Sequence, residues 1–123
     1  MNDKRHQMGR ENEQLAATYL RQNGYTIIQH NFRTQQGEID IIAQDNNTIV
    51  FVEVKSRSST HFGHAVQALT HKQQIRLSKT ALTYLHLNQL KNHSARFDVV
   101  AIQKDPQNGT DIRLIKNAFE CHL

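Results

Sequence analysis

This sequence has few residues that constrain a fold covalently: its 123 residues include one cysteine, one proline and no tryptophan. With Cys121 alone no internal disulfide can form, and such cysteine use is typical of a reducing compartment. A run of about 18 apolar residues is also missing, so no membrane-spanning helix is expected. Residues 1–6 lack the apolar segment of a signal peptide. These absences predict a cytoplasmic protein without a membrane partner.

Basic residues outnumber acidic ones by 15 to 11, which gives a net charge of +4 with neutral histidines. A positive charge permits a polyanionic partner but does not identify one. The length predicts a single domain over residues 1–123, with its core at about residues 8–118.

Two short pairs have spacings that zinc ligands use, but neither carries a strong prediction. His61 and His64 enclose Phe62-Gly63, which favours an ordinary loop. Cys121 and His122 belong to the last four residues, which we expect to be loose.

Hydrophobic periodicity predicts one α/β unit in the order α-β-β-β-α-β-β. The expected elements are a helix over residues 8–23, strands over 25–33, 38–44 and 48–55, a helix from Ala65 or after Thr70 to about 87, and strands over 97–103 and 111–115. Thr70 and Gln73 have the spacing of a capping box, which favours a helix start there.

The first helix is predicted to be amphipathic. Leu15 with Tyr19 and Ala16 with Leu20 form an i, i+4 apolar stripe. Gly24 is expected to end the helix, because glycine adopts the left-handed conformation without a Cβ penalty.

The hairpin of residues 38–55 carries acids inside strands that otherwise look buried. Side chains alternate between the faces of a strand. One shared face is therefore expected to hold Glu38, Asp40 and Ile42 in the first strand and Phe51, Glu53 and Lys55 in the second. The opposite face is expected to hold Ile39, Ile41, Ala43, Val50, Val52 and Val54.

Turn chemistry predicts the register of this hairpin. A two-residue loop of asparagines suits a tight turn. The opposed pairs are then Asp45–Thr48, Ile42–Phe51, Asp40–Glu53 and Glu38–Lys55. Directly opposed Cβ atoms lie about 4.5–5.5 Å apart, so two carboxylates there repel each other unless a cation lies between them. A slip of one residue would place them on opposite faces.

Such an acid pair predicts a Mg²⁺ or Mn²⁺ site, because Mg²⁺ takes one or two carboxylates together with water and phosphate oxygens. Lys55 shares the face of Glu53 and is placed to hold water or to offset phosphate charge. Glu13, at the edge of the first helix's buried stripe, is expected to point at the hairpin. The alternative is a strand whose polar positions simply face water, but residues 48–55 are apolar on both faces, as in a buried central strand.

The same residues resemble the PD-(D/E)xK nuclease superfamily and, within it, the YraN-like uncharacterised protein family related to archaeal Holliday-junction resolvases. The resemblance covers about residues 9–100. It rests on these motifs: Gly9-x-x-x-Glu13-x-x-Ala16-x-x-Tyr19-Leu20, Gly24-Tyr25, Asn31-x-Arg33, Gly37-Glu38-Ile39-Asp40, Phe51-Val52-Glu53-Val54-Lys55-x-Arg57, Phe62-Gly63 and Arg96-Phe97-Asp98-Val99-Val100.

The resemblance implies a restriction-endonuclease-like core, with a central mixed sheet flanked by helices. It also implies a set of roles: metal ligation by Asp40, Glu53 and the carbonyl of Val54, catalysis by Lys55, a further acid from Glu13 and an accessory place for Glu38. Two positions depart from the pattern, since Asn12 stands where glycine is usual and Gln67 where glutamate is common.

Basic residues suggest how DNA would be held. Lys72, Arg76 and Lys79 follow one face of the second helix, where they would contact phosphates or simply face water. Arg33 and Arg57 flank the acidic strands and are better placed for the cleaved strand. Two functions follow: a metal-dependent endonuclease on duplex or branched DNA, as a monomer or homodimer, or a non-catalytic nucleic-acid-binding adaptor with a relic site.

Overall fold

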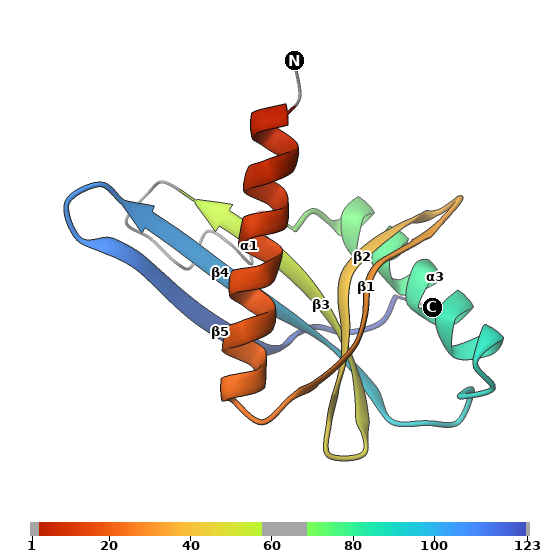
Figure 1. Cartoon of the computed structure of the whole chain (residues 1–123). Coiled ribbons are helices and arrows are strands. Elements are labelled where there is room, and N and C mark those ends of the chain that lie inside the picture. The colour runs from red at the N-terminus through yellow and green to blue at the C-terminus, as the bar shows by residue number, and fades with distance from the viewer. Residues whose placement is uncertain (1–2, 58–68, 123) are drawn as a thin grey trace.

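The computed structural model describes residues 3–57 and 69–122 of the chain. Its elements there are α1 (Asp3–Gln22), β1 (Thr26–Thr34), β2 (Gly37–Asp45), β3 (Thr48–Arg57), α3 (His71–Leu87), β4 (Ala95–Asp105) and β5 (Gly109–Phe119). This sequence of elements confirms the predicted α/β order (Figure 1). None of the described helices has both the length and the apolarity needed to cross a membrane.

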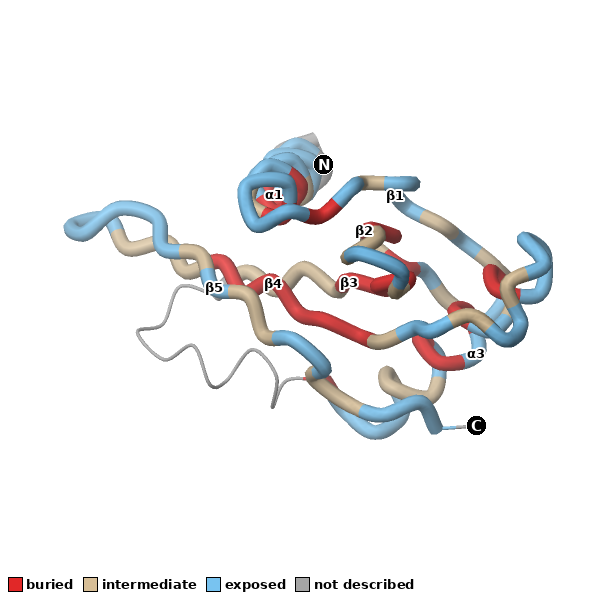
Figure 2. Tube along the Cα trace, turned by 90° about the horizontal axis from the view of Figure 1, so that it is seen from below, coloured by how far each residue is buried: buried red, intermediate tan, exposed pale blue. Residues whose placement is uncertain are grey.

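The strands form one mixed sheet in the order β1-β2-β3-β4-β5. β3 and β4 run parallel, and the remaining neighbours are antiparallel. Helix α1 lies against one face of the sheet and α3 lies on the other side (Figures 1 and 2). Each face therefore has its own apolar core, one beneath α1 and one beneath α3.

The buried side of α1 consists of small residues and one leucine. Ala16, Ala17 and Leu20 are fully or almost fully buried against the sheet, whereas Leu15 is 38% exposed. The predicted stripe is thus confirmed for Ala16 and Leu20 and wrong for Leu15. Successive helical residues are rotated by about 100°, and the side that carries the alanines allows the backbone to lie closer to the strands.

Helix α1 ends as its sequence predicts. Gly24 has a φ of +90°. The amide of Gly24 donates to the carbonyl of Arg21 at 3.0 Å, and the amide of Tyr25 donates to that of Leu20 at 3.0 Å. These two bonds form a Schellman motif, which directs the chain into β1.

Helix α3 begins at the predicted capping box. The Gln73 amide donates to Thr70 Oγ1 at 3.1 Å, and the Thr70 amide donates to Gln73 Oε1 at 3.0 Å. The alternative start near Ala65 lies outside the described residues. Leu77, Ala81 and Leu85 are buried beneath the helix, as expected from their spacing.

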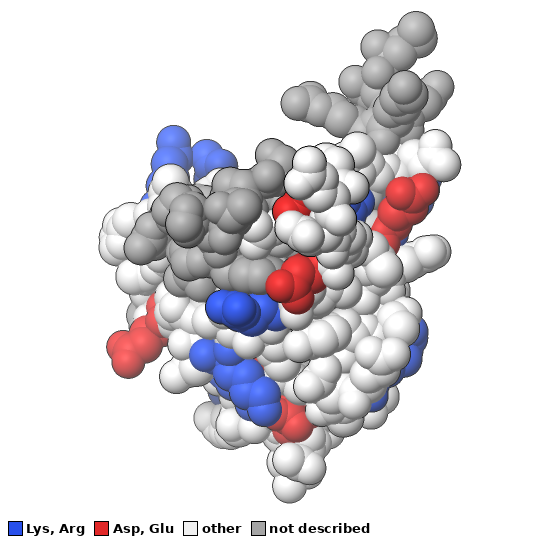
Figure 3. Space-filling model, turned by 90° about the vertical axis from the view of Figure 1, so that its left-hand side faces the viewer, with Lys and Arg blue, Asp and Glu red and all other residues white. Residues whose placement is uncertain are grey.

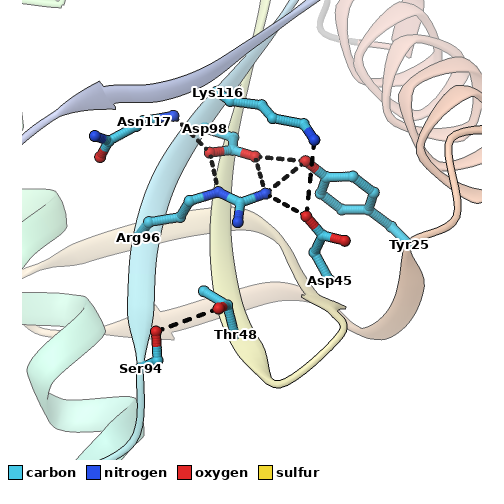
Figure 4. A network of polar contacts seen from close by, with 8 residues as sticks. All are labelled: Tyr25, Asp45, Thr48, Ser94, Arg96, Asp98, Lys116 and Asn117. Atoms are coloured by element: carbon cyan, nitrogen blue, oxygen red, sulfur yellow. Dashed lines mark hydrogen bonds and ion pairs between the residues drawn. The ribbon is translucent and has the colours of Figure 1, made fainter.

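A buried polar network joins β4 to Tyr25 before β1, to Asp45 at the end of β2 and to Asn117 in β5 (Figure 4). The carboxylate of Asp98, which is 1% exposed, accepts hydrogen bonds from Tyr25 Oη at 2.8 Å and Arg96 Nε at 3.0 Å. It also accepts one from the Asn117 amide at 2.9 Å. Arg96 in turn donates to Asp45 Oδ2 at 2.8 Å. Because every buried charge has partners, the network holds the closed end of the β2–β3 hairpin.

The end of the chain packs against α3. The His122 amide donates to Ser78 Oγ at 3.1 Å, and its ring nitrogen Nε2 lies 2.7 Å from Gln74 Oε1. The expectation that the last four residues are loose is therefore wrong for His122. Buried Ser78 and half-buried Gln74 on α3 give this segment hydrogen-bond partners that its own sequence does not predict.

Candidate active site

The site lies where β2 and β3 separate. Their paired register runs from Asp45–Thr48 through Ile42–Phe51 to Ile41–Val52, as the two-residue loop predicts. Beyond that point the ladder ends, one pair short of Asp40 and Glu53. Asp40 Oδ2 instead accepts the backbone N–H of Val54 at 2.8 Å. A carboxylate thus replaces a backbone carbonyl at this fork and binds the two strands together.

Strict alternation fails at Asp40. Ile39 packs with Ile42 in the core beneath α3, whereas Ile41 packs in the core beneath α1. The prediction that Ile39 and Ile41 share a face is therefore wrong. The neighbouring strand is irregular at the same level: Asn31, which lies between two paired positions of β1, has a φ of +53°. This kink places Asp40 where it reaches both β3 and α1.

Glu53 is the most perturbed acid of the site. Its side chain is 18% exposed. Burial, reinforced by hydrogen bonding to Asp40 and by the charge of Asp40, raises the pKa of Glu53 to about 9. Lys55 opposes this shift, with its Nζ 3.8 Å from Glu53 Oε2. The two acids therefore hold a proton between them when nothing else compensates their charge.

Glu13 reaches the same place from α1. It lines, with Asp40, a depression of about 490 Å³ whose other walls are Gly9, Arg10, Asn31, Arg33 and Glu38. Burial and the negative charge of Asp40 raise the pKa of Glu13, and a hydrogen bond to Asn31 opposes the rise. The helix thus adds a third acid on one side of the fork.

The donor set fits a hard divalent cation. Asp40 and Glu53 offer two carboxylates, which is the number that Mg²⁺ commonly takes from protein while it keeps several waters. Within residues 3–57 and 69–122, no three His, Cys, Asp or Glu side chains form a set that would enclose a metal ion. An open site with two carboxylates suits Mg²⁺ or Mn²⁺ better than zinc, which prefers a closed nitrogen and sulfur shell.

Glu38 has a different partner from the predicted one. It pairs with Arg33 across β1 and β2, and its Oε1 lies 3.2 Å from Arg33 Nε. The expected pairing of Glu38 with Lys55 is therefore wrong, because β2 and β3 have already separated at that level. The Arg33 side chain is 72% exposed and lines the depression.

The other basic residues lie on separate elements. Lys72, Arg76 and Lys79 are exposed on α3. Arg57 is the last residue of β3. On the face shown in Figure 3, Lys and Arg atoms gather near the centre and also lie at the edges, with Asp and Glu atoms beside them, so the charge of that face is mixed. His61, His64, Phe62-Gly63 and Gln67 lie outside the described part of the chain.

Five residues that line the site had no predicted role in it, namely Gly9, Arg10, Asn12, Asn31 and Ser56. Asn12 and Ser56 line a cavity beside Glu13 and Asp40, and Arg10 lines the larger depression. For Asn12 a signal existed: it precedes Ala16 and Leu20 at intervals of four, so a polar residue occupies the first position of a buried stripe.

Comparison with known proteins places the sequence among relatives of similar length. Residues 12–102 match the model of the uncharacterised protein family UPF0102. A UPF0102 protein of Syntrophus aciditrophicus is 51% identical over 112 residues, which cover 91% of this chain and 87% of the relative. A UPF0102 protein of Persephonella marina is 45% identical over 112 residues, with coverages of 91% and 92%. One of Vibrio cholerae is 44% identical over 117 residues, with coverages of 94% and 93%.

Proposed function

The chain belongs to the uncharacterised protein family UPF0102, and from the acid pair at its strand fork we propose that it is a Mg²⁺- or Mn²⁺-dependent DNA endonuclease. The observation that carries the proposal is the contact between Asp40 and Glu53. Two carboxylates that face each other at a largely buried position destabilise a fold unless a cation or a proton lies between them. A site retained at such a cost is typical of function.

Each residue then has a role set by its position. Asp40 and Glu53 hold the cation, with the Val54 carbonyl as a further oxygen donor. Bound there, Mg²⁺ supplies Lewis-acid polarisation of the phosphoryl group and acidifies water. Lys55, beside Glu53, orients the attacking water or offsets the charge that develops on the phosphate. Glu13 adjusts the field of the site from α1.

Duplex or branched DNA suits the surface better than a single strand does. Proteins that bind single strands stack bases on exposed aromatic side chains. Among the described residues, the exposed large hydrophobic side chains are Met8, Leu15, Ile28, Leu82 and Leu87, none of which is aromatic. Arginines and lysines aimed at phosphates would give binding that depends on salt and little on sequence. A preference for four-way junctions, and a homodimer that spans two strands, belong to the same proposal.

The test is a cleavage panel. Purified protein is incubated with junction, flap, single-stranded and duplex DNA, with Mg²⁺, with Mn²⁺ or with EDTA, and its mass is followed by light scattering. We expect metal-dependent cleavage of at least one double-stranded form, which Asp40→Asn and Glu53→Gln each abolish. Equal cleavage by wild type and Glu53→Gln would identify a contaminating nuclease. Binding of DNA without cleavage, together with no uptake of either ion by calorimetry, would replace the enzyme by the adaptor.

A further inference from the structure

β5 is an edge strand, and its outer side has no partner strand among the described residues. Residues 109–115 pair regularly with β4, one position after another. The opposite edge strand, β1, is interrupted: its pairing with β2 shifts between Ile27 and Gln29, and Asn31 has a φ of +53°. An irregular edge resists pairing with another chain, whereas a regular edge presents a row of N–H and C=O groups to one. β5 is therefore the edge of this sheet that suits strand addition.

The charges of this edge match a second copy of the same strand. Asp111 and Arg113 are both exposed, and they flank Ile112, the midpoint of the regular residues 109–115. When two β5 strands pair antiparallel with Ile112 opposite Ile112, Asp111 of each copy lies opposite Arg113 of the other. Opposite charges that face each other across two strands stabilise the pair, whereas like charges destabilise it. The strand is thus complementary to itself.

A groove beside the same residue supplies apolar surface. It has a volume of about 580 Å³ and is lined by Leu15, Tyr19 and Ile112, together with polar residues of α1. Ile112 packs on the α1 side of the sheet. Leu15 is exposed and Tyr19 is half-buried, so apolar surface of α1 lies open next to β5 in the described part of the chain. The groove and the complementary charges therefore meet at Ile112.

A two-fold axis through Ile112, perpendicular to the sheet, combines these features. Such an axis places α1 of both copies on the same face of one continuous sheet. Each groove then faces the α1 helix of the other copy, and both Leu15 side chains lie beside the joint. The charged pairs lie on the opposite face, because Asp111 and Arg113 alternate with Ile112 along the strand.

We propose that β5 pairs with β5 of a second copy of this chain, antiparallel and centred on Ile112, and that the α1 grooves of the two copies cover each other. This surface is the interface of the homodimer in the proposed function, and it rests on that part of the proposal alone. None of the described β5 residues lines the depression that Glu13 and Asp40 share. Dimerisation and metal binding are therefore separable.

An exchange of charges tests the register. Association of the full-length protein is measured by sedimentation equilibrium at low salt, in EDTA and without DNA. We expect wild type to form a dimer. Asp111→Arg and Arg113→Asp should each raise the dissociation constant about tenfold or more, because each places like charges opposite each other twice.

An equimolar mixture of these two variants is the decisive sample. It should form a heterodimer about as tight as wild type, since every arginine at the joint then faces an aspartate of the other copy. Within each chain of the mixture, residues 111 and 113 still carry like charges. An effect inside one chain therefore does not explain the recovery, and the recovery shows that both variants fold.

The groove has its own variant and control. Leu15→Gln should weaken the dimer about threefold or more, because the joint loses apolar surface. Leu82→Gln is the matched control, since Leu82 is similarly exposed but lies on α3, on the other side of the sheet, and it should have no effect. Lys91→Asp, an exposed charge reversal before β4, is the control for charge.

Two results would overturn the interface. One is a dimer whose dissociation constant is unchanged by both charge variants, or a mixture of them without a heterodimer. The other is a wild-type protein that stays monomeric at every concentration, which removes the homodimer of the proposed function as well. Neither result bears on metal-dependent cleavage, which Asp40→Asn and Glu53→Gln test. Conversely, a failure to cleave DNA leaves the β5 interface standing, because sedimentation is measured without metal.

Discussion

Replacing Glu53 by glutamine should stabilise the metal-free protein at neutral pH. The pKa of Glu53 rises from 4.5 to about 9 on folding, chiefly because the carboxyl is buried and secondly because it faces Asp40. Between these values the folded protein holds a proton that the unfolded chain has released. Stability is therefore fully present below pH 4.5 and falls as the pH rises toward 9.

The size of the effect follows from the same values. Each pH unit in this window removes up to about 1.4 kcal/mol, so at pH 7 the loss is about 3 kcal/mol relative to a group that never ionises. Glutamine does not ionise, and its NH₂ group can donate to Asp40 as the protonated acid does. We expect Glu53→Gln to match wild type near pH 4.5 and to exceed it by about 3 kcal/mol at pH 7.

Urea unfolding in EDTA at intervals from pH 4.5 to 8.5 measures this difference directly. Glu11→Gln is the control, because Glu11 is exposed on α1 and is not among the charges that shift the pKa of Glu53. Its curve should run parallel to that of wild type. Excess Mg²⁺ should then stabilise wild type more than Glu53→Gln, since only wild type keeps both acids of the fork. A difference between Glu53→Gln and wild type that stays constant across the pH range would refute the reasoning.

Three further outcomes are expected. Lys55→Ala should abolish single-turnover cleavage while calorimetry shows Mn²⁺ binding within about twofold of wild type, because Lys55 is not a ligand. Reversal of charge at Lys72 and Arg76 together should weaken DNA binding and lower the slope of log affinity against log salt by about 2. Tyr25→Phe should lower the free energy of unfolding by about 1–3 kcal/mol, measured in urea, because it removes a hydrogen bond from the buried Asp98.

Each of these three predictions has a control variant, which separates the proposed cause from a general effect of substitution. Lys91→Ala, an exposed change just before β4 and at the end of that strand away from Lys55, should leave turnover unchanged. Charge reversal at Arg21 and Lys91, two exposed basic residues away from the α3 stripe, should alter the salt slope less. An unchanged slope after reversal on α3 would assign that stripe to ordinary solvent exposure. For the network, Tyr19→Phe removes a hydroxyl from a half-buried position and should cost little stability.

Local chemistry made much of the fold predictable. The capping box of Thr70 and Gln73 and the glycine stop at Gly24 act within a few residues, so their geometry follows from neighbours in the chain. The hairpin register is equally local, because a two-residue loop closes the ladder at Asp45 and Thr48. Counting back along both strands brings the two acids of the site near each other, although the paired ladder itself ends at Ile41 and Val52.

Other features depend on partners that are distant in sequence. Glu38 was expected to face Lys55, but its strand is bonded on the other edge to β1, which supplies Arg33. Asp98 reads as one polar residue in an apolar strand, and its four hydrogen bonds come from Tyr25, Arg96 and Asn117. Pairing with both neighbours determines where such side chains point.

By itself, then, the sequence determined the elements that periodicity and turn residues specify, together with the acids that the short hairpin brings into contact. Tertiary structure decided which side of α1 is buried, and with it that Asn12 rather than Leu15 faces the sheet. It also decided that Asp40 ends a ladder instead of continuing it. The physical reason is that alternation and helical periodicity describe one element at a time, whereas burial and strand separation result from packing elements against each other.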